Sequence, residues 1–470
     1  MSTKTKILIL GGGFAGVYAA LRLDRTLARR PDVEVTLVSR DNFLLFTPML
    51  HEVAAADLSP GDIVSPIRRM LRRVTFVQAQ VRSVDSAARR VHCTRDLRSL
   101  PLVLDYDHLV LALGSETSFF GMPDVAENAV TMKTLGDAWL LRARVLALLE
   151  AASLEPDAAT RRQMLTFVAA GGGFAGVETI GAVNDLVRGA LRYYPRLAPQ
   201  EVRVVVVHPG EFVLPELGES LGRYAQRKLA AAGVEVRTGT RVKGYADALV
   251  TLSEGEPIPA TTLIWTAGVT PDPVIAALPF KTEKGRVMVN EFLEVPDFAS
   301  VWAVGDCAAV PDAKTGKPQP PTAQHGLRQG RHAAKNIEAA VAGGRKKPFR
   351  FTALGQLASI GHRRGVAKIL GIRFSGFFAW FLWRAVYLLK LPGLTKKTRV
   401  ALTWALETVF PRDLEQLLTL RDVESITRIG VSLRSGGPAR RLESVEGTDA
   451  EVTDRMVPTV LPGHAVRGRY

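Results

Sequence analysis

The residues of this chain whose types and spacing could do chemistry are, first of all, glycines. The seven-residue string GGGFAGV occurs twice, at Gly11–Val17 and at Gly171–Val177. In such a string the first glycine permits a tight turn, the third lets a pyrophosphate approach the main chain, and the last lets a helix pack closely on a strand. Amides at the start of that helix bind the phosphates. Two copies predict two dinucleotide sites, formed by Gly11, Gly12, Gly13, Phe14, Ala15 and Gly16 and by Gly171, Gly173 and Gly176.

Each glycine string lies between a predicted strand and a predicted helix. The apolar stretch Lys6–Leu10 precedes the first copy and Leu165–Ala170 precedes the second. Helix-forming segments follow at Tyr18–Leu27 and Glu178–Leu186. This strand–turn–helix context is what makes the glycine pattern specific. It predicts an α/β fold with two Rossmann-like dinucleotide-binding domains.

The end of the second strand of each predicted domain should carry an acidic residue that binds a ribose hydroxyl. Neither copy has one in place, because Val33–Val38 is followed by Ser39-Arg40-Asp41 and Val202–Val207 is followed by His208. Ser39 or Asp41 could still reach the ribose of the first nucleotide. The expected cofactor contacts are Ser39 and Arg40 for the first nucleotide and His208 for the second. The choice between NADH and NADPH stays open, although the lack of an Arg or Lys directly after the second strand favours NADH.

Three further segments have the pattern of a flavin site. Leu109–Gly114 and Leu263–Gly268 are strands that run into a small-x-Gly turn, which suits a chain passing close to a cofactor. The strand Ser300–Val304 ends in Gly305-Asp306, where a carboxylate can accept hydrogen bonds from the ribityl hydroxyls of a flavin. FAD is therefore the expected first nucleotide, and the residues added to the predicted cofactor contacts are Ala112, Gly114, Ala267, Gly268, Gly305 and Asp306.

The charge of the chain is unevenly distributed. Its 61 Lys and Arg against 46 Asp and Glu give a net charge of +15. Residues 339–406 contain no acid and thirteen of the basic residues, so the rest of the chain is close to neutral. Charge alone would allow nucleic acid as a partner, but no recognisable nucleic-acid-binding module accompanies it.

Cysteine is scarce, since only Cys93 and Cys307 occur and they lie far apart. No disulfide framework, CxxC pair or cysteine-based zinc site can be written, and no metal site is predicted. The apolar run Ile7–Leu10 is too short for a signal peptide, so we expect a cytoplasmic protein.

The basic stretch also contains two predicted apolar helices. The first covers the aromatic-rich Phe374–Leu391, and the second runs from about Lys397 to Phe410. Arg384 in the middle of the first helix makes spanning a bilayer costly. Arg373 and Arg384 should share a helix face, and aromatic residues beside basic ones favour a helix lying in the membrane interface, where anionic headgroups attract the charges. The alternative is a pair of core or dimer-interface helices.

Taken together, these motifs resemble the two-dinucleotide-binding-domain flavoproteins, and within them the type II NADH dehydrogenases. The resemblance covers roughly residues 4–415 and rests on the paired GGGFAGV strings and on four further segments, FTPML at 46–50, LSPGDI at 58–63, WAVGD at 302–306 and PPTAQHGLRQG at 320–330. It implies that NADH passes hydride to FAD and that two electrons continue to a membrane quinone, without proton pumping.

The resemblance also assigns roles to individual residues. Ala323 and Gln324 would lie beside the flavin and line the quinone pocket, with Gln324 orienting the quinone head. Glu178 would lie near the nicotinamide and the quinone. The family usually has alanine where this chain has Gly326, which we expect to widen the pocket slightly. Three residues, Thr47, Pro48 and Val81, complete the predicted cofactor contacts.

The predicted domains follow from this arrangement. Residues 1–118 and 288–345 form the FAD domain, 119–287 the NAD(P)H domain, 346–415 the quinone-side membrane-anchoring helices, and 416–470 a largely flexible tail. Residues 346–411 would hold the enzyme peripherally on the cytoplasmic face of the cell membrane, and a homodimer could use part of the same surface.

Two other functions remain as alternatives. The first is a soluble NAD(P)H reductase of ferredoxin or a similar acidic carrier, which the aromatic residues 374–383 argue against. The second is a redox-sensing flavoprotein.

Overall fold

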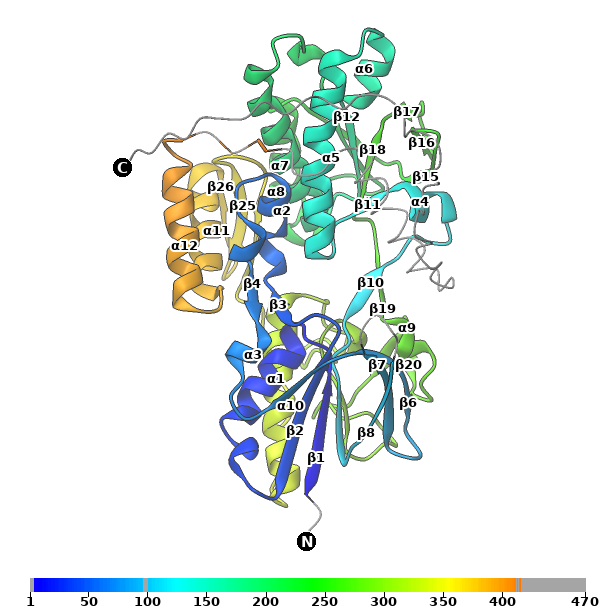
Figure 1. Cartoon of the computed structure of the whole chain (residues 1–470), viewed down its shortest axis with the longest axis vertical. Coiled ribbons are helices and arrows are strands. Elements are labelled where there is room, and N and C mark those ends of the chain that lie inside the picture. The colour runs from blue at the N-terminus through cyan, green and yellow to red at the C-terminus, as the bar shows by residue number, and fades with distance from the viewer. Residues whose placement is uncertain (1–3, 96–99, 411, 413, 416–470) are drawn as a thin grey trace, which may run out of the picture.

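The computed structural model describes residues 4–95, 100–410, 412, 414 and 415. Two parallel five-stranded sheets organise the chain (Figure 1). The first has the order β22-β9-β1-β2-β5, with bounds Val301–Ala303, His108–Leu111, Thr5–Leu10, Val33–Ser39 and Thr75–Gln78. The second has the order β11-β18-β12-β13-β14, with bounds Val130–Thr131, Thr262–Trp265, Thr166–Ala170, Arg203–His208 and Val234–Thr238.

The two sheets repeat one topology around the two glycine strings. In each sheet the strand that enters the glycine string is central, and a helix follows it: α1 (Phe14–Asp24) after β1 and α7 (Phe174–Ala190) after β12. These central strands are buried on both faces, as strands of parallel sheets are. The fold is thus the predicted α/β class with two dinucleotide-binding units.

The two sheets differ in one outer strand, which is β22 in the first sheet and β11 in the second. β11 precedes its sheet's other strands in sequence, whereas β22 comes back from residues 301–303 to join β9. The short antiparallel pair β10 (Ser115–Thr117) and β19 (Val269–Pro271) connects the units, and Figure 1 shows it between them. The chain therefore leaves the first unit after β9, builds the second, and returns.

Smaller elements complete the two units. The antiparallel strands are β3 (Phe43–Leu45), β4 (Val64–Pro66), β6 (Gln80–Asp85), β7 (Arg90–Arg95), β8 (Leu100–Asp105), β15 (Val242–Ala246), β16 (Leu249–Leu252), β17 (Ile258–Pro259), β20 (Thr282–Glu283) and β21 (Arg286–Met288), with β23 (Ala308–Ala309) parallel to β21. The remaining helices of this part are α2 (Leu50–Ala54), α3 (Ile67–Met70), α4 (Pro123–Asn128), α5 (Leu135–Leu154), α6 (Ala158–Met164), α8 (Glu219–Ala231), α9 (Pro273–Ala276) and α10 (Ala323–Val341).

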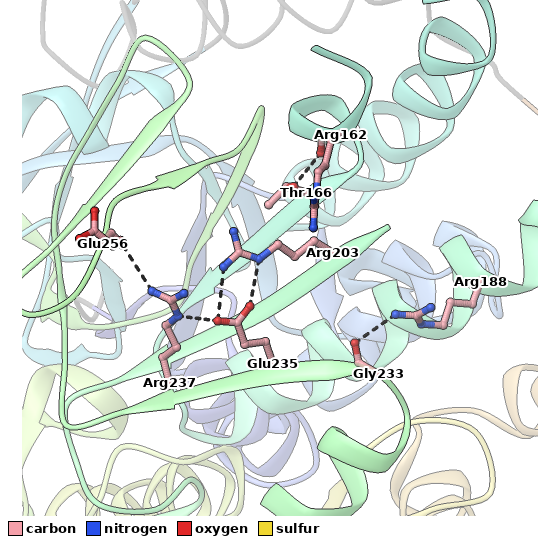
Figure 2. Close-up of polar contacts among 8 residues, drawn as sticks. All are labelled: Arg162, Thr166, Arg188, Arg203, Gly233, Glu235, Arg237 and Glu256. Carbon is pink, nitrogen blue, oxygen red and sulfur yellow. Dashed lines mark hydrogen bonds and ion pairs between the residues drawn. The ribbon is translucent and has the colours of Figure 1, made fainter. Parts of the chain in front are cut away.

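An ion-paired cluster fastens the edge strand of the second sheet (Figure 2). Glu235 on β14 accepts hydrogen bonds from Arg203 Nε on β13 at 2.9 Å and from Arg237 Nε at 2.6 Å. These two guanidinium groups lower the pKa of Glu235 against the opposing effect of burial. The cluster joins the edge strand to its neighbour at the level of side chains as well as backbone.

The C-terminal part contains a sheet that the sequence did not predict. Strands β24 (Gly355–Ser359), β25 (Gly365–Ile369) and β26 (Ile372–Ser375) form an antiparallel sheet, followed by α11 (Gly376–Lys390) and α12 (Leu394–Leu406). Phe374 is therefore in a strand, and α12 begins and ends earlier than predicted. Within the described residues, no helix is both long and apolar enough to cross a membrane. The predicted tail 416–470 lies outside the described residues.

One prediction for this part was wrong. Arg373 lies on β26, so it does not share a helix face with Arg384 on α11. Arg384 is turned inward, with a side chain only 12 % exposed, and its Nη2 lies 3.1 Å from Glu407 Oε2. Its guanidinium is also stacked between Trp380 and Trp404, at 4.3 and 4.6 Å from the ring centroids. Arg384 is an internal ion-pair partner and is not available to lipid headgroups.

Candidate active site

The two glycine strings have nearly the same backbone conformation. Gly11 has φ +113° and Gly171 has φ +112°, a region that glycine adopts readily and other residues rarely do. A Cβ on Gly11 would lie 2.6 Å from the Ala112 carbonyl carbon, and one on Gly171 would lie 2.9 Å from Thr266 Oγ1. Both turns are thus closed by the strand that runs beside them, and only glycine fits.

The third glycine of each string has open space where the first and last do not. A Cβ on Gly13 would meet no protein atom within 4 Å, and one on Gly173 would have Glu216 Oε1 as its nearest neighbour at 4.0 Å. These glycines precede α1 and α7, whose first amides have no side-chain cap. Uncapped amides beside open space fit a pyrophosphate in each unit. Either cradle can therefore hold a dinucleotide.

The residue that ends the second strand packs under each cradle. A Cβ on Gly12 would lie 2.8 Å from Ser39 Cβ, and His208 Nδ1 accepts a hydrogen bond from the Gly172 amide at 3.1 Å. Burial lowers the pKa of His208, so its imidazole is neutral and can accept this bond. Both side chains support their cradles from equivalent positions, and Arg40 beyond Ser39 is exposed.

Asp306 is held at the carboxyl end of the first sheet by residues that the sequence analysis missed. Ser115 Oγ donates to Asp306 Oδ2 at 2.9 Å, and Lys133 Nζ donates to Ser115 Oγ at 2.8 Å. The amide of the neighbouring Gly305 donates to Gln329 Oε1 on α10 at 2.8 Å. Carboxylate, hydroxyl and ammonium groups at this point suit a polyhydroxyl chain beside the first cradle.

The other predicted cofactor residues lie on several different elements. Ala112 is buried next to Gly11, and Gly114 follows it with φ +79°. Ala267 is exposed. Gly268 packs against Phe120, since a Cβ on Gly268 would lie 2.9 Å from Phe120 Cε2. Thr47 and Pro48 lie in the single turn Thr47–Met49, which follows β3. Val81 lies at the start of β6.

Glu178 lies on the first turns of α7 and is buried under the C-terminal part. Its Oε1 accepts hydrogen bonds from the Ser359 amide at 3.1 Å and from Trp383 Nε1 at 3.0 Å. Burial raises the pKa of Glu178 to about 8, against the opposing effect of these two bonds. At neutral pH this carboxyl group therefore holds a proton, which suits a residue that takes part in proton-coupled chemistry.

A second buried cluster of ionisable residues surrounds Arg384 and includes Glu52 and Glu407. Trp404 Nε1 donates to Glu52 Oε2 at 3.0 Å, and Glu52 Oε1 lies 3.9 Å from Arg384 Nη2. Burial raises the pKa of Glu52 to about 8 although Arg384 lowers it. These contacts fasten α11 and α12 to α2, a helix from the sequence of the first unit that packs against α5 and α7 of the second.

The two predicted catalytic residues, on α10 and α7, bind opposite ends of the strand β24. Gln324 Nε2 donates to the Gly355 carbonyl at 3.3 Å, and the amide of Ser359, the last residue of β24, binds Glu178. Four residues of strand span roughly 13 Å, so the pair does not touch and could border one flat ligand from two sides. Ala323 is the first residue of α10, next to Gln324.

Gly326 lies beside the first cradle, and the expected widening of the quinone pocket stays a prediction. A Cβ at this position would lie 3.7 Å from Ala15 Cβ and 3.8 Å from Ala15 N and Gly305 Cα, which are ordinary contact distances. The missing methyl group therefore faces Ala15 and Gly305 beside the first cradle, where α10 crosses α1.

Both cysteines are free and buried. Burial raises the pKa of Cys93 and of Cys307 to about 11 in each case. Thiols of this kind are poor nucleophiles at neutral pH. Neither thiol is therefore assigned a part in the chemistry.

Two nucleotide cradles, a polar site at Asp306 and a buried acid define a two-dinucleotide oxidoreductase. Residues 5–330 match the family described as pyridine nucleotide-disulphide oxidoreductase, and residues 354–413 match the NDH2 C-terminal domain. The chain belongs to the type II NADH:quinone oxidoreductases.

Its similarity to characterised relatives extends over most of the sequence. It is 34 % identical over 419 residues to the type II NADH:quinone oxidoreductase NdhA of Mycobacterium tuberculosis, covering 85 % of this chain and 86 % of the relative. It is 31 % identical to the demethylphylloquinone reductase NdbB of Synechocystis, covering 85 % of this chain and 96 % of that one. NDH2 from Plasmodium falciparum, solved with NADH, superposes with a TM-score of 0.82 at 20 % identity, over 88 % of this chain and all of that one, so it shares the fold.

Proposed function

We propose that this protein oxidises NADH and reduces a membrane quinone by way of bound FAD. The observation that carries the proposal is β24, which contacts the predicted quinone residue Gln324 at one end and the buried acid Glu178, on the helix of the second cradle, at the other. The family assignment supports the same reaction. FAD supplies the hydride and electron transfer, and the protein supplies binding and orientation.

In this proposal the two cradles have separate ligands. The first, with Asp306 and Ser115, holds FAD, and the second holds the nicotinamide dinucleotide. Gln324 orients the quinone head, while Glu178 holds a proton close to the nicotinamide and quinone. NADH is preferred to NADPH, since His208 at the end of β13 is neutral and turned under the cradle. The domain boundaries given above also remain proposals, supported by the two sheets.

We place residues 346–411 against the membrane. The inner face of the α11–α12 hairpin is in the core, with Trp383 and Val400 fully buried. Its outer face is nevertheless apolar, with exposed large side chains at Phe377, Phe378, Phe381, Leu389, Leu394, Leu402, Leu406, Val409 and Phe410. Because the inner face packs on the protein core, the exposed apolar face suits the interface of a bilayer, here on the cytoplasmic side. A homodimer is the other use of this surface, and a vesicle-flotation assay distinguishes the two.

The experiment that tests the function separates its two half-reactions. NADH added anaerobically to the purified holoenzyme should bleach the flavin, and a soluble quinone added next should restore its colour. Gln324→Ala should slow the second step about tenfold, the size of one lost hydrogen bond, and leave the first unchanged. Gln200→Ala, exposed and remote, is the matched control. Equal slowing of both steps would refute the role of Gln324, and wild-type flavin that does not bleach would refute the function.

A further inference from the structure

His51 on α2 is a buried titratable residue to which none of the roles above has been assigned. Its Nδ1 lies 3.8 Å from Glu178 Oε2, and its ring packs edge-on against Trp383 with centroids 5.3 Å apart. The side chain is 7 % exposed, and Nε2 is buried with no hydrogen-bond partner among the described residues. Buried polar atoms normally have a partner, so an open Nε2 indicates a place for a ligand or a water molecule.

The two oxygens of Glu178 are not equivalent. Oε1 accepts both hydrogen bonds, from Ser359 and from Trp383, whereas Oε2 accepts none from the part of the chain that the structure describes and faces His51. A protonated carboxyl group therefore carries its hydrogen on Oε2, 3.8 Å from His51 Nδ1, and a proton passes between the two over one water or after they approach by about 1 Å. The arrangement favours the imidazole tautomer that has its hydrogen on Nε2.

We propose that His51 is the proton-exchange partner of Glu178 during quinone reduction, which rests on the function proposed above. NADH releases two electrons and one proton as hydride, and a quinone needs two electrons and two protons, so one further proton must come from water. In the relay, the Nε2–H bond of His51 breaks as an O–H bond forms on the quinone oxygen, directly or over one water. At the same time the Oε2–H bond of Glu178 breaks and an Nδ1–H bond forms.

The pair is then reset from solvent. After the product leaves, water gives a proton to Nε2, and Nδ1 returns its proton to Glu178 Oε2. The net transfer is one proton from water to the quinone, and the protein ends each cycle in its starting state.

The surrounding charges favour a concerted relay. Burial and the positive charge of Arg384 on α11 lower the pKa of His51 to about 3, so an imidazolium is not a stable intermediate. The other titratable groups facing this cluster are Glu52 and Asp57 near α2, Tyr387 on α11 and Glu407 after α12, and burial raises the pKa of each of them. With Glu178 protonated and the imidazole neutral, a proton can move only if one enters Nδ1 as another leaves Nε2.

The kinetic test uses anaerobic stopped-flow measurements on the holoenzyme. His51→Gln should slow reoxidation of the NADH-reduced flavin by a soluble quinone by about 100-fold, and it should change the solvent deuterium isotope effect of that step. Bleaching by NADH should keep its wild-type rate. The matched control is His108→Gln, since His108 at the start of β9 also has a buried, unpartnered ring nitrogen but lies outside the proposed machinery.

A second measurement uses the wild-type protein, so it does not depend on the variant folding. Nitrogen NMR of histidine-labelled protein should show His51 with its hydrogen on Nε2 at neutral pH. It should change to the Nδ1–H tautomer as Glu178 ionises near its pKa of about 8. Glu178→Gln should remove this change of tautomer. A histidine with a purely structural role would show no such change in the wild-type protein.

The possible outcomes separate the two proposals. A wild-type enzyme that turns over quinone while His51→Gln reoxidises equally fast, or a His51 tautomer indifferent to Glu178, overturns the relay alone. A wild-type flavin that NADH does not reduce, or that quinone does not reoxidise, overturns the proposed function as well.

Discussion

The two GGGFAGV strings make the same cradle but serve different neighbours. Their backbones agree to within a degree at the first glycine, yet the next residue along is Tyr18 in one and Glu178 in the other. Tyr18 lies under the guanidinium of Arg331 on α10, 4.7 Å from the ring centroid, so α1 is covered by a helix of its own unit. Glu178 contacts β24 and α11, so α7 is covered by the C-terminal part. The cradle sets where phosphates bind, and the residue after it sets what each helix packs against.

The largest expected effect comes from breaking one cradle at a time. A Cβ at Gly16 or Gly176 would overlap the carbonyl oxygen of the first glycine of the same string, at a cost of more than about 3 kcal/mol. Gly16→Ala should purify without flavin, whereas Gly176→Ala should keep flavin but fail to be bleached by NADH. Gly189→Ala, which meets nothing within 4 Å on the same α7, is the control. Flavin loss from Gly176→Ala would show that the cradles are not independent.

The second effect tests how the C-terminal part is joined to the first unit. Arg384→Ala leaves the carboxyl groups of Glu52 and Glu407 buried without their shared cation, so unfolding should be easier by about 3–5 kcal/mol. Arg373→Ala, exposed on β26, should change stability by less than about 0.5 kcal/mol. Thermal unfolding of both variants measures the difference. Equal stability of the two would mean that the Arg384 cluster contributes nothing.

Arg384 also shows why part of the molecule could not be predicted. Residues 339–406 contain no acidic residue, but acidic residues from other segments contact them in the folded chain. Arg384, Lys346 and Arg399 pair with Glu407, Glu294 and Asp62. Ion pairs between distant segments depend on tertiary structure, which a local charge count cannot register. The two cradles were predictable because a glycine turn between a strand and a helix is specified locally.

Tertiary packing also brings together the site residues that could not be predicted. Ser115 and Lys133 reach Asp306 only because β22 returns to β9, and His51 reaches Glu178 only because α2 packs near α7. Trp383 was visible as one of many aromatic residues, but nothing in the sequence indicated that its indole binds a carboxyl group in the core. Helix α11 is apolar on both faces, so its pattern alone could not show which face is buried.

A smaller effect is expected from removing the titratable carboxyl group of Glu178, which distinguishes α7 from α1. The folded protein holds a proton on Glu178 up to about pH 8, while the unfolded chain releases it near the ordinary value of 4.5. The folded state therefore binds more protons between these values, and stability falls as pH rises through this window. Glu178→Gln keeps both acceptor contacts and removes the titration, so between about pH 6.5 and 8 wild type should lose about 2 kcal/mol of stability that the variant keeps.

Chemical denaturation across that pH range measures the change. Part of the slope should remain in Glu178→Gln, because burial raises the pKa of Glu52 to about 8 as well. Glu211→Gln, whose side chain is 86 % exposed, should follow the wild-type curve. A Glu178→Gln curve parallel to wild type would mean that Glu178 ionises normally in the folded protein.

The smallest effect concerns the place where α10 crosses α1, which has no counterpart in the second unit. Gly326→Ala adds a methyl group at ordinary contact distance from Ala15 and Gly305, so flavin content and the KM for quinone should stay within about twofold of wild type. Gly330→Ala, one turn further along α10, would overlap the Ala15 carbonyl oxygen and push the helices apart, so it should lose flavin. A changed quinone KM in Gly326→Ala with normal flavin content would place this residue in the quinone pocket after all. Unchanged kinetics would show that the crossing tolerates a methyl group at one glycine and excludes it at the next, because only Gly330 brings the two helix backbones together.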